Sequence, residues 1–216
     1  MISGDIIPVW KEPGITSYDV VDKIKLHNKD VKVGHCGTLD PFAEGVLIVC
    51  KGEAVKKVEE FMLLPKEYRA TIALGYETDT LDKTGDVIKT DDSIPILNKN
   101  IITDVLKEFR GEQLQTPPYF SALKFKGKSL YKYARKGIFI RKKPRKIFID
   151  SIDLINFNDS EITFSVSCSK GTYIRSLSKD IALALNTYGF LSKLIRTSVG
   201  PYNIKNTLKS NSLYAQ

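Results

Sequence analysis

The residues with the clearest chemical potential lie at positions 33–47, where one histidine, one aspartate and three glycines occur together. Pro41 disfavours helical backbone at the residue before it, so we expect Asp40 on an extended turn. The apolar run at 46–50 is typical of a buried strand. A carboxylate held rigidly at the mouth of such a strand is suited to nucleophilic chemistry. The same composition also fits an ordinary loop with a surface aspartate.

The order of residues in this stretch is similar to a known motif. Residues 34–41 read Gly-His-Cys-Gly-Thr-Leu-Asp-Pro, which resembles the G-H-x-G-x-L-D-P motif of the TruB family of tRNA pseudouridine synthases. Further blocks resemble the family's other motifs in the family's order, although Glu12 stands where the family more often has a proline directly after the lysine. These blocks lie at residues 11–21, 66–70, 78–85, 168–177 and 194–201. Six ordered blocks over nearly the whole chain make the resemblance specific.

The resemblance implies catalytic roles for Asp40, Tyr68 and Arg175. Asp40 must be ionised to act, and we expect an ion pair with Arg175 to favour that state. Whether the carboxylate attacks the sugar, adds to the uracil or removes a ribose proton stays open. Tyr68 is implied to stack on the target base and to assist removal of the C5 proton. From pattern alone, Tyr68 also fits a core position and Arg175 a phosphate contact or a surface helix charge.

The resemblance also implies a set of substrate-binding residues. A uridine inside folded RNA must be extruded before chemistry, at a cost of a few kcal/mol. His35 is expected to stack in the gap that the flipped base leaves, as a wedge and not as an acid or base. The other residues implied to bind substrate are Lys11, Gly37, Lys170, Tyr173 and Leu194.

No cofactor and no metal are expected. The isomerisation is redox-neutral, and the sequence has neither a P-loop nor a dinucleotide fingerprint. Three cysteines without a C-x-x-C pair and two histidines do not form a zinc set. We expect reduced thiols, with Cys50 and Cys168 as small core residues. Without a signal peptide or an apolar run of about 20 residues, the sequence predicts a cytoplasmic protein with no membrane partner.

Positive charge is concentrated in one part of the chain. The net charge is +8, which favours a polyanionic partner. Residues 113–149, called the basic segment below, contain no Asp or Glu and eleven of the 33 lysines and arginines. We expect this segment to contact RNA phosphates as an insertion in the catalytic domain. Its interleaved aromatic residues could stack on bases, but we favour core positions for them. They are Tyr119, Phe120, Phe125, Tyr131 and Tyr133.

The periodicity predicts mixed strands and helices without regular alternation. The fold class expected is α+β, with a largely antiparallel central sheet, and the family is similar, with its active-site cleft across a mixed sheet. Thr16 and Asp19 form a capping-box pattern that predicts the start of the first helix. Helices are expected at 16–28, 53–64, 100–109, 129–136 and 172–185. Strands are expected at 6–11, 46–50, 68–74, 146–157, 162–168 and 190–198, with a loop or hairpin at 78–92.

These expectations converge on one function. Residues 1–201 are expected to form a pseudouridine synthase domain, and residues 202–216 a tail too short for the PUA-type domain that many family members carry. The activity implied is isomerisation of uridine 55 in the T loop of tRNA, by a monomer without guide RNA. One alternative is a guide-dependent relative acting on ribosomal RNA. Others are an RNA chaperone, which has no need of a nucleophile, and a generic basic scaffold, which does not explain six ordered motifs.

Overall fold

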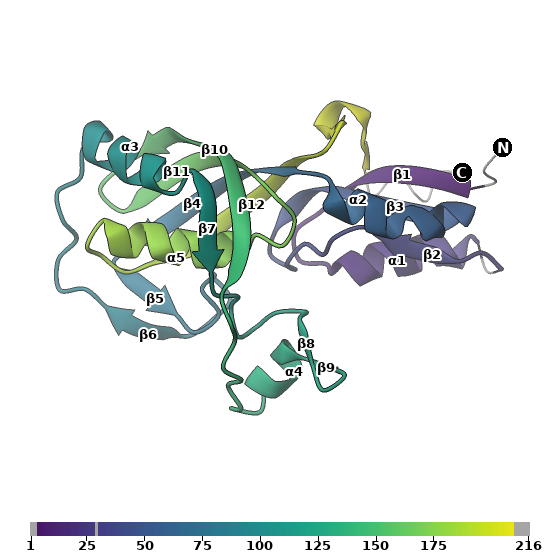
Figure 1. Cartoon of the computed structure of the whole chain (residues 1–216), viewed down its shortest axis with the longest axis horizontal. Coiled ribbons are helices and arrows are strands. Elements are labelled where there is room, and N and C mark those ends of the chain that lie inside the picture. The colour runs from purple at the N-terminus through teal and green to yellow at the C-terminus, as the bar shows by residue number, and fades with distance from the viewer. Residues whose placement is uncertain (1–3, 29, 210–216) are drawn as a thin grey trace. The chain divides into compact units, whose positions relative to one another are not determined.

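The computed structural model describes residues 4–28 and 30–209, which form two compact units (Figure 1). Unit 1 comprises Met1–Arg69, Ser167–Lys170 and Lys193–Gln216, and unit 2 comprises Ala70–Val166 and Gly171–Ser192. The chain passes from one unit to the other within the strands β4 (Lys66–Leu74), β11 (Glu161–Cys168) and β12 (Gly189–Val199), and also between Lys170 and Gly171. Residues 1–3 and 210–216, the latter being the last seven residues of the expected tail, lie outside the described residues.

In unit 1 the strand after the Asp40 turn lies at the centre of the sheet. The hydrogen-bonding order is β14-β1-β3-β12, with β1 antiparallel and β12 parallel to β3. One face of β3 packs Leu47 and Val49 against helix α1, and the other packs Val46 and Ile48 into a second apolar cluster. Burial on both faces explains the continuous apolar run. The elements are β1 Gly4–Lys11, α1 Ser17–Leu26, β2 Val33–His35, β3 Glu44–Gly52, β13 Tyr202–Asn203, η2 Ile204–Asn206 and β14 Leu208–Lys209.

The capping box predicted at the start of α1 is confirmed. The Asp19 amide donates to the Thr16 hydroxyl at 3.0 Å, and the Thr16 amide donates to the Asp19 carboxylate at 2.7 Å. These two bonds satisfy amides that have no partner inside the helix. The helix therefore begins at Ser17, and the Ser17 side chain is buried beside the loop that carries Asp40.

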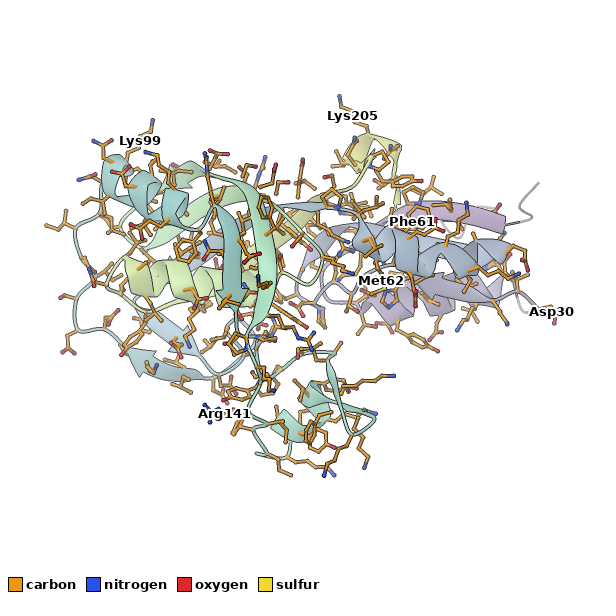
Figure 2. The ribbon with its side chains drawn as sticks, viewed as in Figure 1. Asp30, Phe61, Met62, Lys99, Arg141 and Lys205 are labelled. Carbon is orange, nitrogen blue, oxygen red and sulfur yellow. The ribbon has the colours of Figure 1, made fainter. Side chains whose placement is uncertain are left out.

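The single helix predicted at 53–64 is only partly correct. The structure has a 3₁₀-helix, η1 (Glu53–Lys57), followed by the short α2 (Val58–Leu63). Val55, Val58 and Phe61 pack against the second cluster, whereas Met62 is 45% exposed (Figure 2). The spacing from Val55 to Val58 fits the three-residue turn of the 3₁₀-helix that precedes α2. The sequence prediction used the α-helical period, which placed Met62 on the buried face.

Unit 2 is built on the hydrogen-bonding order β12-β4-β11-β10-β7. In β11 the strict alternation predicted from sequence is confirmed, because Ile162, Phe164 and Val166 are buried. The mixed, mostly antiparallel sheet with flanking helices confirms the α+β class. The remaining elements are β5 Tyr76–Thr78, β6 Val87–Thr90, α3 Lys99–Glu108, β7 Gly111–Gln115, β8 Lys124–Phe125, β9 Lys128–Ser129, α4 Leu130–Ala134, β10 Arg145–Phe157 and α5 Ile174–Ala184.

The basic segment leaves the sheet of unit 2 between β7 and β10 and forms the β8–β9 hairpin and α4 (Figure 1). The prediction that its aromatic residues are core residues is wrong for Tyr119, Phe125 and Tyr131, which are 42%, 39% and 36% exposed. Tyr119 makes an edge contact with Phe139, and Phe125 makes one with Tyr133. Cations also lie over the exposed rings. The Lys142 ammonium is 3.5 Å from the centroid of the Tyr119 ring, and Arg135 lies over Tyr131 at 5.5 Å.

Cys50 and Cys168 are buried, as predicted for small core residues. Within residues 4–28 and 30–209, no helix is both long enough and apolar enough to span a bilayer.

Candidate active site

The turn that carries Asp40 is held on both sides of the aspartate. The Leu39 amide donates to the Ser17 hydroxyl at 2.9 Å. On the other side, the Pro41 carbonyl accepts from the Gly14 amide at 2.8 Å and from the Lys11 ammonium at 3.2 Å. Asp40 is half-buried and lies outside any helix or strand, which confirms the prediction of a turn. Its backbone is therefore fixed by contacts of both of its neighbours.

Lys11 is a buried support of this turn. Its side chain is 0% exposed, and its ammonium donates to the carbonyls of Glu12, Ile15 and Pro41 at 3.0, 2.7 and 3.2 Å. Burial lowers the pKa of Lys11 to about 8, and the negative charge of Asp40 acts in the opposite direction. The structure thus shows Lys11 binding backbone beside Asp40. The substrate contact expected for it stays a prediction.

Tyr68 and His35 both lie in unit 1 with Asp40. Tyr68 lies in β4, and burial raises the pKa of its phenol, while the charge of Arg196 lowers it. His35 lies in β2, and burial lowers its pKa, with a further contribution from the charge of Arg196. Within the described residues, His35 Nδ1 is buried and makes no hydrogen bond. A neutral imidazole fits the stacking role expected for His35 better than a role as a cation.

Unit 1 also contains three further residues of the predicted set. Gly37 has φ +94°, a left-handed conformation that favours glycine, and its carbonyl accepts a hydrogen bond from Arg196. Leu194 is buried in β12, and Lys170 is exposed in the turn that follows β11. The structure therefore gathers Asp40, its two supports and most of the predicted set in one unit.

The sequence analysis missed Arg196 as a residue of this region. Arg196 is 1% exposed, and its Nε and Nη2 donate to the carbonyls of Val46 and Gly37 at 2.7 and 3.1 Å. One signal could have identified it. Arg196 follows the buried Leu194 by two residues in the same strand, so both side chains face the same side of the sheet.

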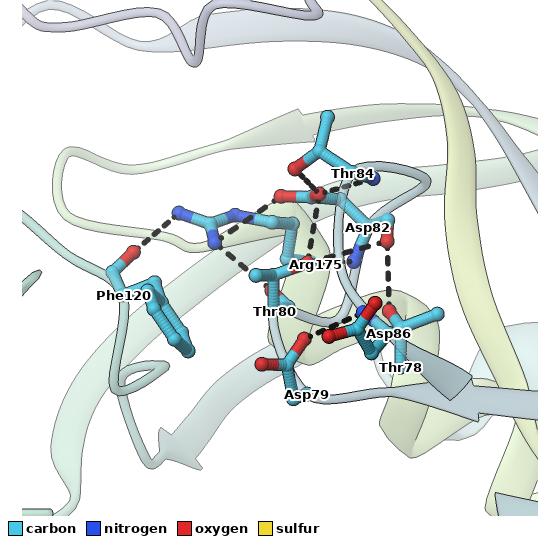
Figure 3. Close-up of polar contacts among 8 residues, drawn as sticks. All are labelled: Thr78, Asp79, Thr80, Asp82, Thr84, Asp86, Phe120 and Arg175. Carbon is cyan, nitrogen blue, oxygen red and sulfur yellow. Dashed lines mark hydrogen bonds and ion pairs between the residues drawn. The ribbon is translucent and has the colours of Figure 1, made fainter. Parts of the chain in front are cut away.

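Arg175 is the predicted catalytic residue that lies in unit 2, near the start of α5 (Figure 3). It is 5% exposed, and its Nη1 lies 3.3 Å from the Asp82 carboxylate, which is itself buried. The guanidinium also donates to the carbonyls of Thr80 and Phe120 at 3.0 and 2.8 Å. The interpretation of Arg175 as a surface charge is wrong. Its ion pair with Asp40 stays a prediction.

The carboxylate and the carbonyl of Asp82 accept hydrogen bonds from residues of its own loop (Figure 3). One carboxylate oxygen accepts from the Thr84 amide and from the Thr80 hydroxyl, each at 2.9 Å, and the Thr78 hydroxyl donates to the Asp82 carbonyl at 2.7 Å. A Cβ at Gly85 would lie 2.9 Å from the Thr80 backbone nitrogen and 2.2 Å from the Asp79 carboxylate, and because the backbone cannot move aside this turn requires glycine. The block at 78–85 is thus a rigid support for the Arg175 guanidinium.

Tyr173 lies at the start of α5, where Gln115 holds its backbone. The Gln115 amide accepts from the Tyr173 N–H at 2.8 Å and donates to the Tyr173 carbonyl at 3.0 Å. Gln115 is buried, and no local pattern in the sequence indicates this pairing across 58 residues. The contact fixes the helix end that precedes Arg175.

Comparison with known proteins identifies the family. Residues 23–174 match the model described as TruB family pseudouridylate synthase, N-terminal domain. The chain belongs to this family. It is 45% identical over 203 residues to a tRNA pseudouridine synthase B of Clostridium tetani, covering 94% of this chain and 70% of that protein. A tRNA pseudouridine synthase B of Francisella philomiragia is 44% identical over 208 residues, covering 96% and 69%.

Two solved structures contain chains that share the fold. One belongs to a Cbf5-Nop10-Gar1 complex, with a TM-score of 0.73 and 31% identity, covering 94% of this chain and 51% of that chain. The other belongs to an H/ACA RNP bound to a substrate RNA, with a TM-score of 0.70 and 28% identity, covering 96% and 51%. This chain therefore spans about half the length of those two chains.

Proposed function

We propose that this chain isomerises uridine to pseudouridine at position 55 in the T loop of tRNA, without a cofactor. The observation that carries the proposal is the Asp40 turn, which is fixed by Ser17 and Lys11 within a chain that belongs to the TruB family. Relatives named tRNA pseudouridine synthase B are 42–46% identical over at least 90% of this chain. In the proposed reaction the bond from C1′ to N1 breaks and a bond from C1′ to C5 forms, C5 loses its proton and N1 gains one, so no redox partner is needed.

The buried cations of unit 1 support an ionised Asp40. A carboxylate next to positive charge is stabilised in its charged form, and Lys11 and Asp40 interact in this way. We further propose the ion pair with Arg175 that the sequence predicts. Arg175 is oriented for its task by Asp82 and by two backbone carbonyls.

The base must leave its stack before Asp40 can act on it. We propose that His35 fills the vacated position and that Tyr68 stacks on the flipped uracil. The pKa of Tyr68 is raised by burial, so the phenol keeps its proton at neutral pH and can hydrogen-bond to the base. Leu194, Tyr173, Gly37 and Lys170 complete the substrate-binding set that we propose.

We propose tRNA alone as the partner, with residues 1–201 as the catalytic domain and the basic segment as its RNA-binding insertion. The guide-dependent alternative is less well supported, because the chains from the H/ACA and Cbf5-Nop10-Gar1 complexes are 27–31% identical to this one, whereas the relatives named tRNA pseudouridine synthase B are 42–46% identical. A monomer in the cytoplasm is the simplest form for this role.

The test is conversion of a T stem-loop RNA labelled at the target uridine, with no other component added. Wild type is expected to form pseudouridine. Asp40→Asn is expected to keep the fold, because the backbone bonds of Leu39 and Pro41 remain, and to abolish turnover. The matched control is Asp159→Asn, at an exposed turn, which should turn over like wild type. An inactive wild type contradicts the function, and an active Asp40→Asn contradicts the assignment of Asp40.

A further inference from the structure

Arg196 is a fully buried charge that the proposed chemistry does not use directly. An arginine stays protonated in proteins, and burying such a charge is costly unless hydrogen bonds compensate. Within the described residues, Arg196 forms no ion pair. Its Nε and Nη2 donate to the carbonyls of Val46 and Gly37.

The two carbonyls that Arg196 binds lie on either side of Asp40 in the chain. Gly37 precedes the aspartate by three residues, and Val46 follows it by six, inside β3. The guanidinium therefore joins the entrance of the turn to the strand that leaves it. Neither Ser17 nor Lys11 makes this connection, since they bind Leu39 and Pro41.

The backbone of Arg196 lies in close contact with β3 at Gly45. Arg196 pairs with Gly45 in the parallel β12–β3 ladder. Gly45 has φ +122°, and a Cβ there would lie 2.2 Å from the Arg196 carbonyl oxygen and 2.7 Å from its nitrogen. Glycine at 45 is therefore required for β12 to approach this closely. This close approach brings the Arg196 guanidinium within hydrogen-bonding distance of the Gly37 carbonyl.

We propose that Arg196 is a positioning residue of the reaction, which fixes the Asp40 turn by tying the Gly37 carbonyl to β3. This proposal rests on the proposed function. Arg196 acts on Asp40 through the backbone that presents it, and its side chain also interacts with the Tyr68 hydroxyl. Its charge also reaches the neighbouring Lys11, His35 and Tyr68, whose pKa values it lowers.

The experiment compares Arg196→Lys and Arg196→Gln with Lys193→Gln, which removes an exposed charge from the same strand. A misplacement of about 1 Å at a reacting group costs about 100-fold in rate. We expect kcat of Arg196→Gln on the T stem-loop to fall about 100-fold, with KM changed less than about threefold. Lysine carries its three N–H donors on a single nitrogen and lacks the planar fork with which Nε and Nη2 reach the two carbonyls, so Arg196→Lys is expected to show an intermediate loss. Lys193→Gln should keep the wild-type kcat.

A second readout does not depend on turnover. The pKa of His35, measured by NMR from its ring carbon-bound proton, should rise in Arg196→Gln and not in Lys193→Gln. A kcat within about threefold of wild type in Arg196→Gln, or a change confined to KM, overturns the proposal. If neither Arg196 variant folds, the residue serves the fold and the positioning role is wrong. An inactive wild type instead refutes the proposed function. The His35 measurement would still report whether the charge of Arg196 lowers the pKa of His35.

Discussion

Tyr68 combines an aromatic ring with a hydroxyl whose pKa is raised by burial, and these two properties can be separated. Tyr68→Phe keeps the ring and therefore the stacking surface. If the hydroxyl assists proton transfer at C5, kcat should fall by about 10²–10⁴-fold, with little change in KM. Release of label from C5 of the uracil measures this step directly. A variant that turns over like wild type leaves Tyr68 with a packing role alone.

His35 should make stability depend on pH in a defined direction. Its folded-state pKa lies below the ordinary value of 6.5 because the ring is buried and Arg196 is nearby. Below pH 6.5 the unfolded chain binds a proton that the folded chain does not, so the free energy of unfolding falls as the pH falls. The contribution of His35 is fully present above pH 6.5.

The measurement is urea unfolding of wild type and His35→Asn at pH 7.5 and pH 5.5. Wild type is expected to lose more stability between these two pH values than the variant, which cannot titrate at this position. Equal losses in the two proteins would show that His35 is protonated as easily in the folded state as in the unfolded state.

At the scale of the elements, the loop between β5 and β6 contributes one partner of a buried ion pair. Asp82 and Arg175 are both buried and lie 3.3 Å apart. Removing one partner of a buried ion pair costs about 3–5 kcal/mol because the other charge is left uncompensated. Asp82→Ala should therefore lower the free energy of unfolding by about that amount, and it should also lower kcat because Arg175 loses its orientation.

The matched control for this variant is Asp86→Ala in the same loop. Asp86 is exposed, and its bond to the Asp79 carboxylate uses the backbone amide, which alanine retains. Chemical denaturation and single-turnover kinetics of both variants separate the two effects. A stable, active Asp82→Ala would mean that the loop does not orient Arg175.

The elements that the sequence predicted are those whose signals are local. The capping box of α1 lies within four residues, and the alternation of β11 repeats every two, so neither depends on distant contacts. Pro41 likewise placed Asp40 on a turn. The contacts of Arg196 with Gly37 and of Gln115 with Tyr173 join residues 159 and 58 positions apart. No periodic pattern in the sequence indicates contacts between residues so far apart, so the sequence analysis predicts neither contact.

At the scale of the whole molecule, charge is the property that matters for a tRNA substrate. The chain carries a net charge of +8, and its basic segment holds cations beside exposed rings. RNA binding by phosphate neutralisation releases counterions, so affinity falls with salt in proportion to the number of phosphates contacted. Exposed lysines of this segment should account for much of the decrease in RNA affinity with increasing salt.

Replacing Lys124, Lys128 and Lys132 with glutamine removes three exposed charges from the basic segment. The slope of log affinity for tRNA against log salt should become shallower by about 2, since each phosphate contact contributes about 0.7–0.9. The control replaces Lys99, Lys107 and Lys205, which are exposed elsewhere (Lys99, Lys205 and the basic-segment residue Arg141 are labelled in Figure 2). Both triple variants have the same net charge, so a general effect of charge would change both slopes equally. Equal slopes would show that the basic segment does not contact the RNA backbone. A change confined to the first variant would locate the tRNA on the segment where exposed rings and cations lie together.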